Sequence, residues 1–133
     1  MERRCIFSPN GSPAAGPYSH AVAAGNLLFV SGQGPFAKDG SGPVRGTFEE
    51  ETRRTLDNLK AVLEDAGSGL PHVVKITAFL ADIVNFGAFN KVYQEYFSTD
   101  CPARTCVQAG RLPVDIQVEV EAIAIIAEQQ TNK

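Results

Sequence analysis

Mostly apolar residues recur at helical spacing in the stretch that follows Thr47. Thr47 and Glu50 have the spacing of a capping box, in which each side chain accepts a hydrogen bond from the other residue's backbone N–H. The pattern predicts one long amphipathic helix that ends at Gly67, and we interpret its acidic first turn, Glu49–Glu51, as a solvated face that complements the helix dipole. The periodic residues are Thr52, Leu56, Leu59, Leu63 and Ala66.

A second run of helical spacing is aromatic. It predicts a helix that starts near Asn85 and ends before Ser98. We interpret the stripe as a core face rather than a cofactor site, because no glycine-rich phosphate loop or metal-spaced ligand set accompanies it. The residues, three and four positions apart, are Phe86, Phe89, Tyr93 and Phe97.

Six other segments are rich in β-branched or alternating apolar residues and predict strands. The dipeptide Gly25-Asn26 suits a tight hairpin turn between the second and third strands. The nearly continuous apolar run at 73–81 indicates an inner strand of a sheet. The predicted strands are Arg4–Phe7, His20–Ala24, Asn26–Ser31, Val73–Ala81, Arg104–Ala109 and Ile116–Ile126.

The order of these elements predicts an α+β fold. Three strands, a helix, a strand, a helix and two strands are typical of a single mixed β-sheet with two helices packed on one face. The 133 residues fit one domain, 1–133, which would bury about two-thirds of its unfolded surface. We expect the polar end, 128–133, to be a frayed tail.

Composition narrows the classes of partner and compartment. The formal net charge is −3 and the twelve Lys and Arg residues are scattered, so we do not expect a nucleic-acid partner. Three cysteines, Cys5, Cys101 and Cys106, cannot all pair within one chain and match no zinc or disulfide framework. This favours a cytoplasmic protein, with mitochondria as the alternative. No segment approaches the roughly 18 apolar residues of a membrane span, so no membrane association is expected.

The stretch PARTCVQAGRLP, residues 102–113, sets Arg104 and Cys106 two positions apart in a predicted strand. Alternate residues of a strand share a face, so the two side chains project together. A guanidinium presents a planar fork of N–H donors that matches a carboxylate. Arg104 is therefore a candidate anchor for a small carboxylate, and an ordinary surface salt bridge is the alternative.

Polar residues line one face of the last predicted strand. Gln117, Glu119 and Glu121 alternate with apolar residues, so the carboxylates face water, a cleft or another subunit. A partly desolvated carboxyl group has a raised pKa and suits general acid/base catalysis. A hydrated sheet face is the alternative interpretation.

Cys106 invites comparison with thiol enzymes. The two histidines, His20 and His72, lie in no stretch typical of a Cys–His site, so we do not assign a nucleophile here. We interpret Cys106 as lining a pocket beside Arg104, with a half-buried structural cysteine as the alternative.

Four motifs in order resemble those of the Rid family, also called YjgF. They are GPYSHAV at 16–22, SGQGP at 31–35, TLDNLKAVLEDAG at 55–67, and PARTCVQAGRLP followed by DIQVEVEAIA at 115–124. The resemblance covers nearly the whole chain and points to the RidA branch, the reactive intermediate deaminases.

The resemblance implies a chorismate-mutase-like homotrimer with a site at each subunit interface. The implied reaction is hydrolysis of 2-imino acids, such as 2-iminobutanoate and 2-iminopropanoate, or of their enamines, to 2-oxo acids and ammonia. It requires no metal or organic cofactor. Glu119 has the family's spacing from Arg104, so these two are the candidate catalytic residues. The implied substrate-binding residues are Tyr18, Gly32, Asn90, Arg104 and Cys106.

An alternative hypothesis is that the protein has this fold but little catalytic activity. The family also includes members described as translation inhibitors, endoribonucleases or chaperone-like proteins, so a ligand-binding or protein-interaction trimer is the alternative. The presence of Arg104 favours the imino-acid hypothesis, because family branches without this arginine lack the carboxylate anchor.

Overall fold

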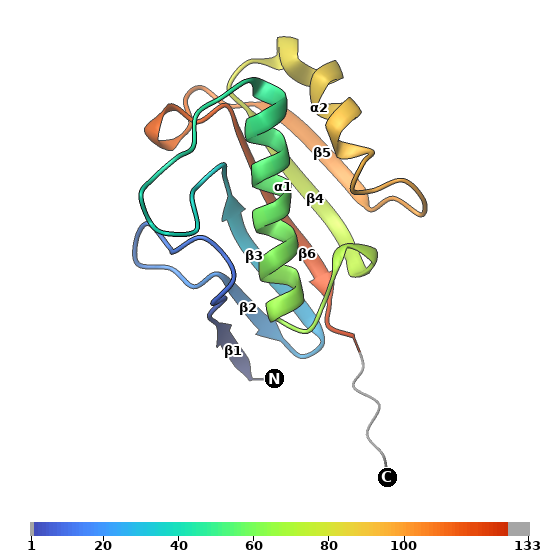
Figure 1. Ribbon diagram of the computed structural model, residues 1–133. Helices are drawn as coiled ribbons and strands as arrows, with labels where there is room; N and C mark the ends of the chain where they lie inside the picture. The colour runs from blue at the N-terminus through green and yellow to red at the C-terminus, as the bar shows by residue number, and fades with distance from the viewer. Residues whose placement is uncertain (1, 128–133) are drawn as a thin grey trace.

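The computed structural model describes residues 2–127 as one six-stranded sheet with two helices on one side (Figure 1). The predicted tail, 128–133, lies outside the described residues. Three short 3₁₀ turns connect the main elements, at Leu70–His72, Ile83–Asn85 and Pro113–Asp115. The strands and helices are β1 (Arg3–Ile6), β2 (Ala21–Ala24), β3 (Leu27–Gln33), α1 (Phe48–Asp65), β4 (Val73–Leu80), α2 (Phe86–Tyr93), β5 (Ala103–Gln108) and β6 (Val118–Ile125).

The sheet has the strand order β1-β2-β3-β6-β4-β5. β4 and β5 run parallel and every other neighbouring pair is antiparallel, so the predicted mixed α+β sheet is confirmed. The hairpin between β2 and β3 turns at Gly25, whose φ of 60° suits a residue without a side chain. β4 is an inner strand, as predicted, because it pairs with both β6 and β5. β6, the last strand, lies between β3 and β4 and joins the two parts of the sheet.

The long helix α1 begins with the predicted capping box. Thr47 Oγ1 accepts the N–H of Glu50 at 3.1 Å, and Glu50 Oε1 accepts the N–H of Thr47 at 2.9 Å. The interpretation of 49–51 as a solvated face is wrong for Glu51, which is buried. Its carboxylate accepts hydrogen bonds from the backbone and the side chain of Gln117, at 3.1 and 2.7 Å. Glu51 therefore ties the start of α1 to the residue that precedes β6.

Two of the predicted boundaries, the end of α2 and the start of β6, differ from those in the structure because the backbone turns there. α2 ends at Tyr93, where the last turn tightens through a hydrogen bond from the Tyr96 N–H to the Tyr93 carbonyl at 3.0 Å. β6 starts at Val118 rather than Ile116, because Val114 and Asp115 adopt left-handed φ angles of 49° and 56°. The same irregularity turns the Gln117 side chain toward α1, so Gln117 does not share a face with the two glutamates that follow it.

The two faces of the sheet differ in what covers them. Side chains on the helix side form the hydrophobic core, in which Leu56 and Leu59 of α1 pack with Ile76 of β4 and Val120 of β6. The other side, which we call the open face, carries no helix in Figure 1. Several apolar side chains on the open face stay 39–44% exposed, namely Leu27, Phe29, Val107 and Ile125. The structure thus has one buried apolar layer and a second apolar surface without cover from the described residues.

Candidate active site

Arg104 lies on the helix side of the sheet. It pairs in register with Ile76, whose side chain is fully buried beneath the helices, so the Arg104 side chain leaves β5 toward α2. Its guanidinium carbon is 4.8 Å from the centre of the Tyr93 ring, and 5.5 and 5.6 Å from the rings of Phe89 and Phe86. Aromatic faces attract a cation at these distances. The aromatic stripe of α2 therefore holds the charged end of Arg104.

Arg104 makes no ion pair with a carboxylate among residues 2–127. The salt bridges in that part of the chain join Arg53 to Glu95 and Arg111 to Asp115. No hydrogen bond from the Arg104 guanidinium to these residues is formed either, so its N–H donors keep their capacity for a ligand. The alternative interpretation of Arg104, an ordinary surface salt bridge, is therefore wrong for the described residues.

Cys106 lies on β5 with Arg104, and Asn90 lies on α2, the helix whose rings contact Arg104. Cys106 shares its face, as predicted, and is half-buried against the core. Burial raises the pKa of the Cys106 thiol, while the nearby Arg104 opposes that rise, so the thiol stays protonated at neutral pH and is a poor nucleophile. The Asn90 side-chain oxygen is buried without a hydrogen-bond partner among the described residues. We call Arg104, Cys106 and Asn90 the arginine half-site.

Glu119 lies on the open face of the sheet. It pairs with Phe79, one position out of phase with the buried Ala78 and Val120. Burial raises the pKa of the Glu119 carboxyl group, and repulsion from the Glu121 carboxylate raises it further. The desolvated carboxyl that acid/base work requires is therefore present at this position.

Gly32 lies directly against Glu119. A Cβ atom at this glycine would stand 2.9 Å from the Glu119 carboxyl carbon, so a side chain here would displace the carboxylate from its present position. The β3–β6 pairing shifts between Val30 and Gln33, which marks a β-bulge around Gly32. The bulge is the local feature that brings the two residues together.

Tyr18 reaches the same area from the loop between β1 and β2. It lines a small hollow together with Gly32, and its ring is 48% exposed. The Ala15 N–H donates to its hydroxyl oxygen at 3.0 Å, which leaves the O–H free to donate. The buried His20 anchors the loop, because the Ser8 N–H donates to its Nδ1 at 3.1 Å and its Nε2 lies 2.7 Å from the Ser12 carbonyl. We call Glu119, Gly32 and Tyr18 the glutamate half-site.

One chain does not bring the two half-sites together. Arg104 leaves the sheet on the side of the helices and Glu119 leaves it on the open face, so the sheet itself separates them. Sequence reasoning found both residues but did not assign their faces relative to each other. It also missed the three rings that hold Arg104, because an aromatic stripe at helical spacing is ordinarily a core face.

Comparisons with known proteins agree with the family resemblance of the four sequence motifs. A family model described as Endoribonuclease L-PSP matches residues 10–126. A RutC family protein from Pyrococcus abyssi is 44% identical over 124 residues, which cover 93% of this chain and 98% of that protein. The solved structure of RidA from the Antarctic bacterium Psychrobacter sp. PAMC 21119 superposes with a TM-score of 0.88 at 35% identity, covering 92% of this chain and 99% of that one. The chain belongs to the Rid/YjgF family.

A second solved structure bears on ligand chemistry. The Rid/YjgF chain described here is 34% identical to Escherichia coli TdcF, whose structure was solved with bound serine. The two superpose with a TM-score of 0.87, over 93% of this chain and 99% of TdcF.

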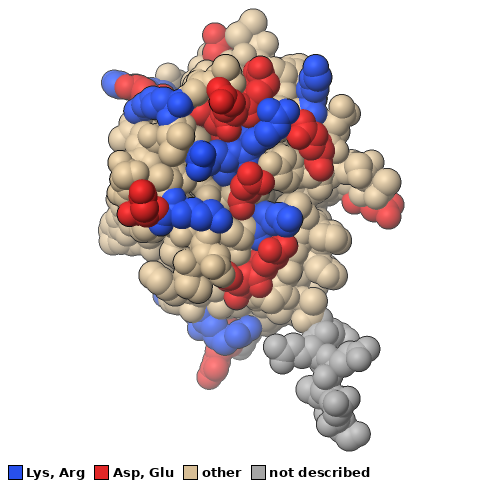
Figure 2. All heavy atoms as spheres, viewed as in Figure 1, with Lys and Arg blue, Asp and Glu red and all other residues tan. Residues whose placement is uncertain are grey.

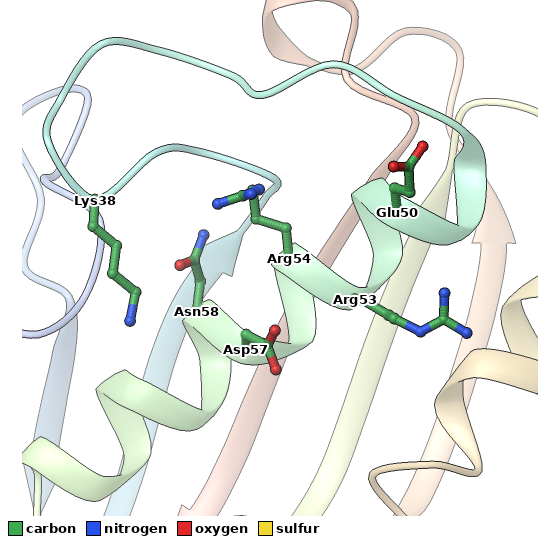
Figure 3. Close-up of a pocket in the computed structure, with 6 residues that line it drawn as sticks. All are labelled: Lys38, Glu50, Arg53, Arg54, Asp57 and Asn58. Atoms are coloured by element: carbon green, nitrogen blue, oxygen red, sulfur yellow. The ribbon is translucent and has the colours of Figure 1, made fainter.

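A larger hollow lies over α1, away from both half-sites (Figure 3). Most polar groups that line it already have structural partners. Arg53 pairs with Glu95, Asp57 accepts the Tyr96 hydroxyl at 2.8 Å, and the Asn58 amide donates to the carbonyls of Gly34 and Phe36. We therefore do not assign the site of this Rid/YjgF protein to that hollow.

On the face that carries α1, Lys and Arg side chains are interspersed with Asp and Glu (Figure 2), whereas a nucleic-acid surface gathers cations. Within residues 2–127, no group of three His, Cys, Asp or Glu side chains is arranged to hold a metal ion. Neither helix of the described chain combines the length and hydrophobicity needed to cross a membrane.

The raised pKa of Glu119 predicts a pH-dependent effect on stability. The carboxyl binds its proton more tightly in the folded chain, so its contribution is favourable at low pH and is lost as pH rises through the folded-state pKa. Glu119→Gln should therefore raise the melting temperature at pH 7, by roughly 1–3 °C. The difference from the wild type should vanish below the ordinary glutamate pKa of about 4.3.

Thermal melting of both proteins between pH 3.5 and 8 measures this effect. Glu64→Gln, on the exposed side of α1, is the control and should shift the melting temperature little at any pH. A Glu119→Gln variant that is less stable than the wild type at pH 7 would show that the carboxylate is not desolvated.

Proposed function

We propose that this protein belongs to the RidA branch and hydrolyses reactive 2-imino acids, or their enamines, to 2-oxo acids and ammonia. The observation that carries the proposal is the Arg104 guanidinium, which lies on aromatic rings and has no carboxylate partner among the described residues. A cation that is held against aromatic rings and has no counter-ion is a site for a small anion. The serine bound in the TdcF structure is also a small molecule with an α-carboxylate.

Arg104 would bind the substrate carboxylate through two parallel N–H···O bonds. A bidentate pair fixes the plane of the carboxylate and hence the position of the neighbouring C=N carbon. Asn90 and Cys106 would line the pocket beside it. Because the thiol is protonated and no histidine contacts it among the described residues, Cys106 contributes shape rather than a nucleophile.

Glu119 would activate the attacking water. A carboxyl with a raised pKa accepts a proton better near neutral pH than an ordinary glutamate. Glu119 takes one proton from water as the water oxygen bonds to the C=N carbon, and returns it to the nitrogen. The hydroxyl proton of the resulting carbinolamine then passes through Glu119 to the same nitrogen while the C–N bond breaks and the C=O bond forms, so ammonia leaves and the 2-oxo acid remains. Gly32 and Tyr18 would complete this side of the pocket.

The mechanism requires two subunits, and we propose a homotrimer with a site at each interface. The sheet separates Arg104 from Glu119 within one chain, so an arginine half-site can meet a glutamate half-site only across an interface. The open face supplies an apolar surface for such contact, since Leu27 and Phe29 are partly exposed there.

Ribonuclease activity is the second candidate, because the matching family model carries that description. The interspersed charges on the α1 face do not favour RNA binding (Figure 2). A ligand-binding trimer without turnover is the third candidate. The cytoplasmic location also stays a prediction, which rests on three free cysteines.

The first prediction concerns the fork of Arg104. Arg104→Lys keeps the charge and loses the bidentate geometry, so it should weaken 2-oxobutanoate binding nearly as much as Arg104→Ala. We expect a loss of roughly tenfold to 150-fold, the equivalent of one charged hydrogen-bonded pair. Calorimetry measures the affinity, and ammonia release from dehydratase-generated 2-iminobutanoate measures the rate.

Arg54→Lys, on the exposed side of α1, is the matched control and should bind and react like the wild type. Wild-type behaviour of Arg104→Lys would argue against the carboxylate anchor and would return the ribonuclease or binding-module hypothesis to first place. RNA cleavage by the wild-type protein, measured in parallel, would do the same.

The second prediction concerns Glu119 as the base. Glu119→Gln keeps the shape but cannot accept the proton, so the rate of imine hydrolysis should fall by about 100- to 10,000-fold while 2-oxobutanoate still binds. Glu121→Gln changes a carboxylate on the same face and should keep most of the activity. Undiminished turnover by Glu119→Gln would remove this residue from the mechanism.

The third prediction concerns assembly. Light scattering at micromolar concentration should give a mass near three times the 14.2 kDa of one chain. Phe29→Lys puts a charge on the open face and should reduce both the mass and the rate of imine hydrolysis, whereas Glu64→Lys on α1 should change neither. A monomeric wild type with full activity would contradict the shared site.

A further inference from the structure

The aromatic rings of α2 and of the turn after it contact both the hydrophobic core and the Arg104 guanidinium. Phe89, Tyr93 and Phe97 are buried and stack in sequence, with ring centres 5.4 and 4.7 Å apart. Tyr93 is the middle ring of this stack and is also the ring nearest to the Arg104 guanidinium. One residue thus connects the packed interior to the proposed carboxylate anchor.

Tyr93 combines burial with an unused polar group. The side chain is 6% exposed, and its hydroxyl has no hydrogen-bond partner among the described residues. Burial raises the pKa of Tyr93 to about 12, while the Arg104 charge opposes that rise, so the phenol stays neutral at physiological pH. The attraction between the two residues is therefore that of a cation for an aromatic face and not that of an ion pair.

We propose that Tyr93 is the positioning residue for Arg104, and this inference rests on the proposed function. Its ring, held by Phe89 and Phe97, fixes the guanidinium through the face of an uncharged group. An aspartate or glutamate in the same place would orient the guanidinium equally well but would occupy the N–H donors that the substrate needs. The Tyr93 ring orients the Arg104 guanidinium and leaves its N–H donors available for the substrate.

The proposal predicts a specific loss on removal of the ring. Tyr93→Leu should weaken 2-oxobutanoate binding by roughly 3- to 30-fold, the range of a cation–π contact that is partly desolvated. Tyr93→Phe keeps the ring and should restore binding close to that of the wild type. Because the hydroxyl has no partner among the described residues, Tyr93→Phe should also melt at or above the wild-type temperature.

Two variants provide matched controls. Phe97→Leu removes a ring from the same stack, but that ring does not contact Arg104, so it should lower the melting temperature and weaken 2-oxobutanoate binding much less than Tyr93→Leu does. Tyr96→Phe removes a hydroxyl that donates to Asp57 at 2.8 Å on the side of α1, and it should also bind normally. Calorimetry with 2-oxobutanoate and thermal melting are measured for all variants under one condition.

NMR of the arginine side chains gives a readout that does not depend on turnover. The Arg104 Nε–H signal, assigned by its loss in Arg104→Lys, should be shifted by ring currents in the wild type, in Tyr93→Phe and in Phe97→Leu. It should move toward the position of an exposed arginine in Tyr93→Leu. If Tyr93→Leu does not fold, Tyr93→His, which keeps a smaller ring, takes its place and should show an intermediate shift and affinity.

Each outcome decides the proposal. Wild-type affinity in Tyr93→Leu, or an equal loss in Phe97→Leu, would overturn it, because the effect would then be absent or merely structural. Failure of the wild type to hydrolyse 2-iminobutanoate would contradict the proposed function, while the binding and NMR series would still decide the role of Tyr93. A wild type that does not bind 2-oxobutanoate would overturn both.

Discussion

The alternation of side chains across a β-strand is the constraint on which the candidate site depends. Arg104 and Glu119 stand on neighbouring parts of one sheet, yet the register through β4 places them on opposite faces. No rotamer change carries a side chain through a hydrogen-bonded sheet, so one chain holds only two separate half-sites. The same alternation creates the core under the helices and the apolar open face. In the proposed mechanism, the assembly of subunits and the chemistry both depend on this alternation.

The surroundings of the two half-sites have opposite effects on charge: those of Glu119 disfavour its charged form, whereas those of Arg104 stabilise its charge. Glu119 is partly desolvated next to Gly32 and near a second carboxylate, which favours its protonated form and makes the carboxylate a stronger base. Arg104 keeps its charge, because aromatic faces attract a cation without neutralising it. A substrate with an anionic group at one end and an electrophilic carbon at the other fits between such residues. This match of charge types supports the imino-acid hypothesis more directly than either residue alone.

Irregular segments set the positions of the catalytic candidates. The β-bulge in β3 presents Gly32 to Glu119, and the left-handed turn at Val114 and Asp115 determines where β6 begins. Arg45 stabilises that turn by donating to the carbonyls of both residues, at 2.5 and 3.0 Å. A β-branched residue at positive φ is strained, and strain of this kind persists only where surrounding contacts hold it. The start of β6 is therefore held in place by a contact 69 residues away in sequence.

The amino-acid sequence by itself determined the elements, the single mixed sheet and the family, because periodicity, capping and turn residues are local signals. The capping box at Thr47 and the hairpin at Gly25 are examples. The sequence also indicated which face of β6 carries Glu119, because alternate residues of a strand lie on the same face. Tertiary structure alone decided that Arg104 lies on the other side of the sheet, that Glu51 is buried against Gln117, and that the guanidinium lies over the Tyr93 ring. These facts depend on the register between strands and on packing between distant elements, and no local pattern records either.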